Sequence, residues 1–244
     1  MREIVPGATN AGQSRGVAAR LLEVRAGRAV AFGPHGEPSA IHKQPVPGRV
    51  RVATLGLVGD EQADRKHHGG PDKALHHYPR EHYAVWQATL SERAARFVSG
   101  GFGENLVTLG MCEQDVCVGD VFRLGSATIQ VAQGRQPCWK LNVRFALPDM
   151  ARRVQDTGCA GWYYRVIEEG EIAAHDSFEL IARPHPEWTI AAVQRVLYRD
   201  CLEQDSLAAL SELAALAPGW RALAARRLAT GAVEDWSRRL DTPV

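Results

Sequence analysis

One cysteine in the sequence stands among groups that would make its thiol chemically useful. Cys138 lies between a proline and a tryptophan, with Arg135 three residues before it and Lys140 two residues after it. Nearby cations favour the thiolate, which is the nucleophilic and metal-binding form of cysteine, and a thiolate is a soft ligand suited to a redox-active transition metal. The alternative is a small buried cysteine that packs as an apolar residue. Because of its polar neighbours, Cys138 is the best candidate for a functional thiol among the five cysteines.

A second segment rich in chemistry covers residues 64–72, where six of nine residues are Asp, His, Lys or Arg. The pair Gly69-Gly70 would let backbone N–H groups approach an anion and form a nest around it. A polar surface loop is one alternative. Another is a zinc hydrolase centred on Asp64, His67 and His68. However, two adjacent histidines cannot both turn inward from a regular strand, and the usual zinc spacings are missing.

A third segment, residues 101–106, places glycine on both sides of a phenylalanine and continues into Glu104 and Asn105. The amide of Asn105 offers both a donor and an acceptor, so it could read the edge of a heterocycle. A structural turn is the alternative, and for this motif taken alone it is the better interpretation.

The few lysines point to the same region of the chain. Only four of the 29 basic residues are lysine, and all four lie between residues 43 and 140. They are Lys43, Lys66, Lys73 and Lys140. Lysine presents a compact, hydrated charge that suits phosphate. The net charge of only +1 gives no electrostatic case for a protein that wraps nucleic acid.

The elements that would position these groups are mainly strands. Short apolar stretches between residues 21 and 183 alternate or are bounded by glycine turns, and residues 20–25 and 29–32 suggest a hairpin around Gly27. Helices are expected near residues 79–90 and 147–155. Many short strands with few helices predict an α+β fold with a β-barrel-like domain.

The composition changes after Pro184. Helical patterns follow at residues 189–198, 206–216 and 218–228, with Thr189 and Ser206 as candidate N-caps and Pro218 opening the third helix. We therefore predict a loose leader at 1–20, a barrel-like domain at 21–184 and a small three-helix domain at 185–244. Five cysteines make no disulfide framework. Because no signal peptide or membrane-spanning run is evident, we expect a cytoplasmic protein without membrane contact.

Several separated motifs, in this order, closely resemble the signature of MOSC domains, which are named for the C-terminal domain of molybdenum cofactor sulfurases. The motifs are Gly56-x-x-Gly59-Asp60, Asp64, His68-Gly69-Gly70-Pro71-Asp72-Lys73-Ala74, Phe102-Gly103-Glu104-Asn105-Leu106, Gly119-Asp120 and Cys138-x-Lys140-Leu141. Ser39-Ala40-Ile41-x-Lys43 and the three-helix tail are similar to the YiiM-like subgroup. The resemblance covers nearly the whole chain after about residue 20.

The resemblance implies a β-rich barrel that binds a molybdopterin-type cofactor, with Cys138 as the thiolate ligand of molybdenum. It also implies reduction of N-hydroxylated bases, such as 6-hydroxylaminopurine, and of related N-oxygenated compounds. Such detoxification would use electrons from a separate flavoprotein reductase or ferredoxin. The substrate would be a free small molecule rather than a nucleic acid polymer.

The remaining site residues take roles that fit this cofactor. Lys43, Lys73, Arg135 and Lys140 could hold its anionic end, Asp60, Asn105 or Asn142 could read the pterin ring, and His68 could deliver a proton. Two alternatives stay open. The first is a non-catalytic cofactor-binding or sulfur-carrier module with a persulfide on Cys138. The second is the zinc hydrolase described above.

Overall fold

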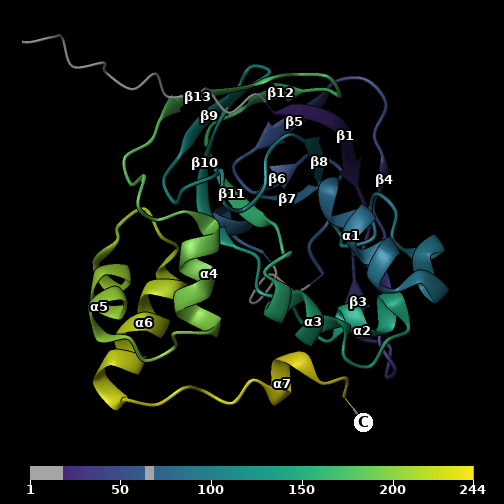
Figure 1. The fold of residues 1–244 in the computed structure, drawn as a ribbon. Coiled ribbons are helices and arrows are strands. Elements are labelled where there is room, and N and C mark those ends of the chain that lie inside the picture. The colour runs from purple at the N-terminus through teal and green to yellow at the C-terminus, as the bar shows by residue number, and fades with distance from the viewer. Residues whose placement is uncertain (1–18, 64–68, 244) are drawn as a thin grey trace, which may run out of the picture.

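A mixed eight-stranded sheet organises the larger part of the chain in the computed structural model, which describes residues 19–63 and 69–243 (Figure 1). Its strands are β1 (Arg20–Ala26), β4 (Gln44–Pro45), β7 (Leu75–Pro79), β8 (Leu106–Leu109), β9 (Val121–Leu124), β10 (Ala127–Gly134), β11 (Trp162–Glu168) and β13 (Phe178–Ala182). They are ordered β13-β9-β10-β11-β7-β8-β1-β4, with β7 and β8 parallel and the other pairs antiparallel.

The sheet curls toward a barrel because its two ends approach each other. Arg20 at the start of β1 forms an isolated antiparallel bridge with Ser177, just before β13, and His175 N–H donates to the carbonyl of Leu21 over 2.8 Å. Two small sheets complete the domain. One contains β5 (Val50–Ala53), β6 (Gly56–Leu57) and β12 (Gly170–Ile172). The other contains β2 (Val30–Ala31) and β3 (Pro38–Ser39). The predicted α+β, barrel-like fold is confirmed.

Short helices cover one flank of the sheet and enclose a second apolar core. They are α1 (Glu81–Thr89), η2 (Ser91–Arg96), α2 (Lys140–Phe145) and α3 (Met150–Thr157), whereas the short helix η1 (Pro71–Lys73) contacts β10 and β11. In this core Phe102 stacks on Tyr78 with ring centroids 4.1 Å apart and also contacts Phe145. The helices predicted near 79–90 and 147–155 are α1 and α3, whereas α2 was not predicted.

The C-terminal helices are α4 (Ile190–Tyr198), α5 (Gln204–Glu212), α6 (Pro218–Thr230) and the short α7 (Ser237–Leu240). Ile190 and Val193 of α4 belong to the same core as the barrel, so the helical domain packs directly on it. The hydroxyl of Thr189 accepts from Ala192 N–H over 3.0 Å, as expected of the N-cap, and α6 begins at Pro218. The prediction for Ser206 is wrong, since Glu203 caps α5.

The predicted hairpin over residues 20–25 and 29–32 is also wrong. Strand β1 pairs with β8 and β4, and β2 pairs with β3. The glycine pattern at 26–28 is that of a turn, but the backbone N–H of Gly27 donates to the carboxylate of Asp60 over 2.7 Å, 33 residues away. The contact with Asp60, rather than a tight hairpin turn, thus fixes the backbone at Gly27. Within the described residues, no helix is long and apolar enough to cross a membrane.

Candidate functional site

One cavity collects most of the side chains that the sequence singles out. Its empty volume is about 620 Å³, part of it open to solvent. The predicted site residues that line it are Lys43, Asp60, Lys73, Asn105, Arg135, Cys138 and Lys140. They come from segments almost a hundred residues apart, which the curled sheet brings together. We call this cavity the thiol cleft.

Cys138 occupies the turn between the end of β10 at Gly134 and the start of α2 at Lys140. It is 8% exposed and lines the cleft, and all five cysteines of the chain carry thiols rather than disulfides. Because α2 begins two residues later, the cysteine sits on a short connection held by regular structure on both sides. Such a rigid position suits a ligand more than a mobile nucleophile.

A buried hydrogen-bonded centre forms one wall of the cleft. Asp60 pairs with the ammonium of Lys43, accepts from the Asn105 amide over 2.9 Å, and also accepts from the Gly27 backbone. Burial lowers the pKa of Lys43, and the charge and hydrogen bond of Asp60 oppose that change. Arg25 fixes the backbone of Lys43 by donating to its carbonyl over 2.9 Å. Asp60 therefore orders this wall.

Asn105 is committed to the protein itself. Its amide nitrogen donates to Asp60 and, over 3.1 Å, to the carbonyl of Arg25, while its oxygen accepts from the His76 backbone N–H over 3.0 Å. Because both ends of the amide are engaged, Asn105 is placed to hold β1 and β7 together at the cleft. Donation to a ring would require it to break one of the two bonds made by its nitrogen, whereas its oxygen keeps a second lone pair.

Among the described residues that line the cleft, two buried side-chain atoms have no hydrogen-bond partner. They are Nη1 of Arg135, a residue only 6% exposed, and Nε2 of His76. Burial, and then the charge of Arg135, lower the pKa of His76 well below its usual value, so its imidazole is neutral. Buried donors and acceptors are normally satisfied. These two atoms are therefore available to hydrogen-bond a polar ligand in the cleft.

Two lysines complete the cationic lining. Lys73 ends the short helix η1, which begins after Gly70, a glycine with φ of 96° that a side chain would disfavour. Lys140 donates to the carbonyl of Pro38 over 2.8 Å, and its ammonium lies 5.9 Å from the ring centre of Trp139. Both side chains line the cleft, at its opening rather than in its buried wall.

Two predicted site residues are not placed in the cleft. His68, together with the zinc candidates Asp64 and His67, lies outside the described residues. Asn142 is the second, and the prediction that it reads the ring is not supported by its position. Its amide nitrogen donates to the carbonyl of Leu240 over 2.8 Å and its oxygen accepts from Ala151 N–H over 2.8 Å, so it joins α2 to α3 and to the C-terminal segment.

Sequence reasoning missed His76 and Tyr163, which line the cleft with ring centroids 4.9 Å apart. Burial raises the pKa of Tyr163, so its phenol keeps its proton at neutral pH. The signal was the pair His76-His77 inside a strand, because neighbouring strand residues face opposite sides. His76 faces the cleft, whereas His77 faces the core and stacks on Trp162 at 4.0 Å.

Other motif residues maintain the fold rather than the cleft. Glu104 is fully buried, and its carboxylate accepts from the N–H groups of Gly100 and Phe102 over 2.6 and 3.0 Å, which closes a structural turn over residues 100–104. Asp120 accepts two hydrogen bonds from the guanidinium of Arg183, of 2.9 and 2.7 Å. The turn interpretation of the third segment thus describes Glu104 well.

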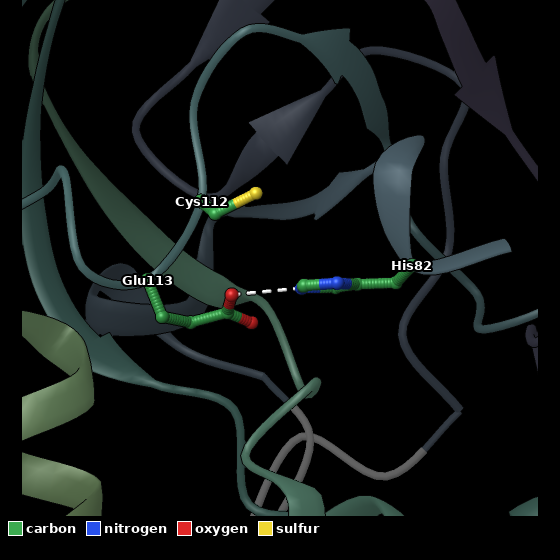
Figure 2. Close-up of side chains that lie close together, drawn as sticks. All are labelled: His82, Cys112 and Glu113. Carbon is green, nitrogen blue, oxygen red and sulfur yellow. Dashed lines mark hydrogen bonds and ion pairs between the residues drawn. The ribbon is translucent and has the colours of Figure 1, made fainter. Parts of the chain in front are cut away.

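Away from the thiol cleft, three side chains form a group that could bind a metal by type, and two of them, His82 and Glu113, line a second cavity. Among the described residues, His82, Cys112 and Glu113 have ligand atoms within 4.8 Å of one another (Figure 2). The carboxylate of Glu113, however, already pairs with Nε2 of His82 at 2.7 Å and accepts from Ala160 and Gly161 N–H groups. These partners define a buried ion pair that ties α1 to the start of β11.

The ion pair predicts a pH-dependent loss of stability. Burial alone would lower the pKa of His82, but hydrogen bonds to Cys159 and Glu113 raise it to about 10. Because this folded-state value exceeds the value of about 6.5 for an unfolded histidine, the stabilisation is complete below pH 6.5 and disappears as the pH approaches 10. We expect His82→Gln to lower the free energy of unfolding by about 3 kcal/mol at pH 6, and by much less at pH 9.5.

Urea unfolding of both proteins at the two pH values measures this difference. His185→Gln is the matched control, because the contact of His185 with Glu187 is 3.8 Å long and half exposed, and it should cost under about 1 kcal/mol. A His82→Gln cost that is the same at pH 6 and pH 9.5 would show that no protonated pair stabilises the fold.

The fold and the thiol cleft together define a barrel-like α+β protein with a cation-lined, cysteine-containing ligand site. Comparison with known proteins gives the same class. Residues 64–179 match the family model of the MOSC domain, and residues 188–231 match that of the YiiM-like, 3-alpha helix domain. The chain therefore belongs to the MOSC family, in the YiiM-like group.

Individual relatives agree with this assignment. The chain is 43% identical over 219 residues to Protein YiiM of Escherichia coli strain K12, covering 90% of this chain and 97% of that protein. The crystal structure of YiiM from Escherichia coli matches with a TM-score of 0.75 at 37% identity, over 87% of this chain and 98% of the other. A protein of Gibberella moniliformis named Reductase is 40% identical over 195 residues, which are 79% of this chain and 35% of that protein.

Proposed function

We propose that this protein is a molybdenum-cofactor-dependent reductase of N-hydroxylated bases and related N-oxygenated compounds, with Cys138 as the thiolate ligand of molybdenum. Membership of the MOSC family is consistent with a role related to the molybdenum cofactor, and one relative carries the name Reductase. The observation that carries the proposal is the position of the Cys138 thiol in one cleft with a buried, incompletely bonded arginine.

The donor set of the cleft fits such a cofactor. A molybdopterin-type cofactor has an anionic phosphate and a hydrogen-bonding heterocycle, and the cleft offers cations at its opening and unpartnered polar atoms deeper inside. The guanidinium of Arg135 is suited to phosphate by its fork of N–H donors. Lys73 and Lys140 would add charge at the opening, and Cys138 would supply the soft ligand.

When bound, the cofactor supplies the two-electron reduction, and the protein contributes binding, orientation and proton handling. The neutral imidazole of His76 can exchange a hydrogen bond at Nε2 without adding charge beside Arg135. The Tyr163 phenol, which keeps its proton, can donate into the cleft. We further propose that His68 delivers the proton needed when an N–O bond is cleaved.

Among the described residues that line the cleft, Cys138 is the one cysteine, so no dithiol there is offered as an electron source. We propose a separate flavoprotein reductase or ferredoxin as donor and a free hydroxylamino compound as substrate. The direct test is turnover of 6-hydroxylaminopurine by protein purified from a cofactor-producing host and supplied with a chemical reductant, followed by chromatography. Loaded protein that shows no turnover, but from which cyanide releases sulfur bound to Cys138, would instead favour a sulfur carrier.

Removal of the buried guanidinium should weaken cofactor binding directly. Hydrogen bonds to charged groups contribute about 1.5–3 kcal/mol each, so Arg135→Gln should lower the affinity for the pterin by roughly 10- to 100-fold. The pterin retained per chain after extensive dilution and gel filtration measures this loss. Arg123→Gln is the matched control, because Arg123 lies on β9 in a half-exposed pair with Glu179 at 3.9 Å. Equal retention by Arg135→Gln and the wild type would exclude Arg135 as an anion contact.

A further inference from the structure

The C-terminal segment returns from the helical domain to the cysteine of the thiol cleft. After α6 ends at Thr230, the chain crosses to α7, which lies beside α2 and α3 (Figure 1). Leu240 is 1% exposed and belongs to the same apolar core as Phe145 of α2, so the segment is anchored rather than loosely apposed. We call residues 236–241 the clasp.

The clasp contacts the cysteine turn on both sides of Cys138. The guanidinium of Arg239 donates to the carbonyl of Pro137 over 2.5 Å, and the carbonyl of Arg239 accepts from Trp139 N–H over 2.8 Å. One residue on, the carbonyl of Leu240 accepts from the amide of Asn142 in α2 over 2.8 Å. The residue before Cys138 and the residue after it are therefore both bonded to one residue of the clasp.

Arg239 is itself held in place by two other elements. Its second terminal nitrogen donates to the side chain of Gln155 in α3 over 2.5 Å, and its guanidinium carbon lies 5.8 Å from the ring centre of Tyr198, the last residue of α4. Tyr198 in turn contacts Trp236, with ring centroids 6.0 Å apart. The side chain of Arg239 thus contacts both the last residue of α4 and the cysteine turn.

We infer that Arg239 is a positioning residue for Cys138, and that the helical domain serves the cleft by fixing the cysteine turn through the clasp. The role extends the proposed function, in which Cys138 must present its sulfur to a metal in one geometry. A metal-binding side chain keeps its productive geometry when the neighbouring residues are held in place. Displacement of such a side chain by about 1 Å is enough to lower activity about 100-fold.

Three variants separate positioning from general stability. Arg239→Gln removes the bond to Pro137, and Arg239→Lys keeps the charge and one donor. Arg238→Gln removes the same charge from the neighbouring exposed residue of α7. Hydrogen–deuterium exchange of the full-length proteins, read in peptides covering 137–142 and 190–198, reports on the cysteine turn and on the helical domain. kcat and KM of the loaded proteins are measured in parallel.

We expect Arg239→Gln to accelerate exchange in 137–142 about tenfold, the size of effect expected from one lost hydrogen bond to a charged group, with little change in 190–198. Arg239→Lys should be intermediate and Arg238→Gln unchanged. In the loaded enzyme kcat should fall while KM stays near its original value. The positioning role of Arg239 is overturned if Arg239→Gln leaves exchange in 137–142 unchanged, or if Arg238→Gln accelerates it equally. Absence of molybdenum from the wild type overturns the proposed function and leaves the exchange result independent of it.

Discussion

Cys138→Ser is expected to eliminate reduction of N-hydroxylated bases while leaving the fold intact. Loss of a residue that only supports a metal ligand typically costs about 10–100-fold in metal affinity or activity, so loss of the ligand itself should exceed 100-fold. Serine occupies nearly the same volume but offers a hard oxygen that remains protonated at neutral pH, which is a poor substitute for a soft thiolate. Steady-state turnover at saturating reductant measures the effect.

The matched control for this variant is Cys201→Ser. Cys201 follows α4, and its thiol donates to the carbonyl of Leu197, far along the chain from the cleft. It should retain wild-type turnover, and circular dichroism should show the same fold for both variants. Turnover by Cys138→Ser at the wild-type rate would remove Cys138 from the chemistry altogether.

The second large effect is expected at Asp60, because three groups depend on its carboxylate. Asp60→Ala leaves the ammonium of Lys43 buried without its partner and frees the Asn105 amide and the Gly27 backbone. Removing one partner of a buried ion pair costs about 3–5 kcal/mol. We expect a loss of that size in the free energy of unfolding, together with loss of cofactor, since one wall of the cleft loses its order.

Glu61→Gln provides the comparison, because Glu61 is the next residue and its ion pair with Arg28 is exposed at 3.6 Å. An exposed pair of this kind contributes about 0–1 kcal/mol. Urea unfolding of the two variants should therefore differ by several kcal/mol. If Asp60→Ala is as stable as Glu61→Gln, Asp60 is not the organising residue of this wall.

The sequence allowed the cleft to be predicted better than the bonds inside it. Lys43, Lys73, Arg135 and Lys140 stood out because their residue type and spacing suggest anion contacts, and all four line the cavity. Spacing does not reveal, however, that the ammonium of Lys43 is already paired with Asp60. Whether a polar group faces a ligand or a protein partner depends on contacts between distant segments.

Residue type also gave no guide to the orientation of two further side chains, Asn142 and His76. Asn142 looked like a cleft residue because it lies four positions after Cys138, but the start of α2 between them turns its amide toward Leu240. His76 went unnoticed inside a run of histidines, although strand alternation places it on the cleft side and His77 on the core side. In both cases local geometry, rather than residue type, decides the role.

Long-range pairing also decided which elements formed. The segment around Gly27 has the composition of a hairpin turn, yet β1 pairs with β4 and β8 because its buried residues belong to the barrel core. By contrast, the helices of the C-terminal domain depend on local signals such as Thr189 and Pro218, and these were found correctly. The contribution of the clasp to the cleft could not be read from either kind of signal.

We propose that the thiol cleft binds a molybdenum cofactor through Cys138. The most direct measurement is molybdenum, zinc and pterin per chain, determined on wild type and Cys138→Ser purified side by side from a cofactor-producing host. We expect about one molybdenum and one pterin per wild-type chain and a loss of molybdenum in the variant. Stoichiometric zinc without molybdenum or pterin in the wild type, or equal molybdenum in both proteins, would contradict it.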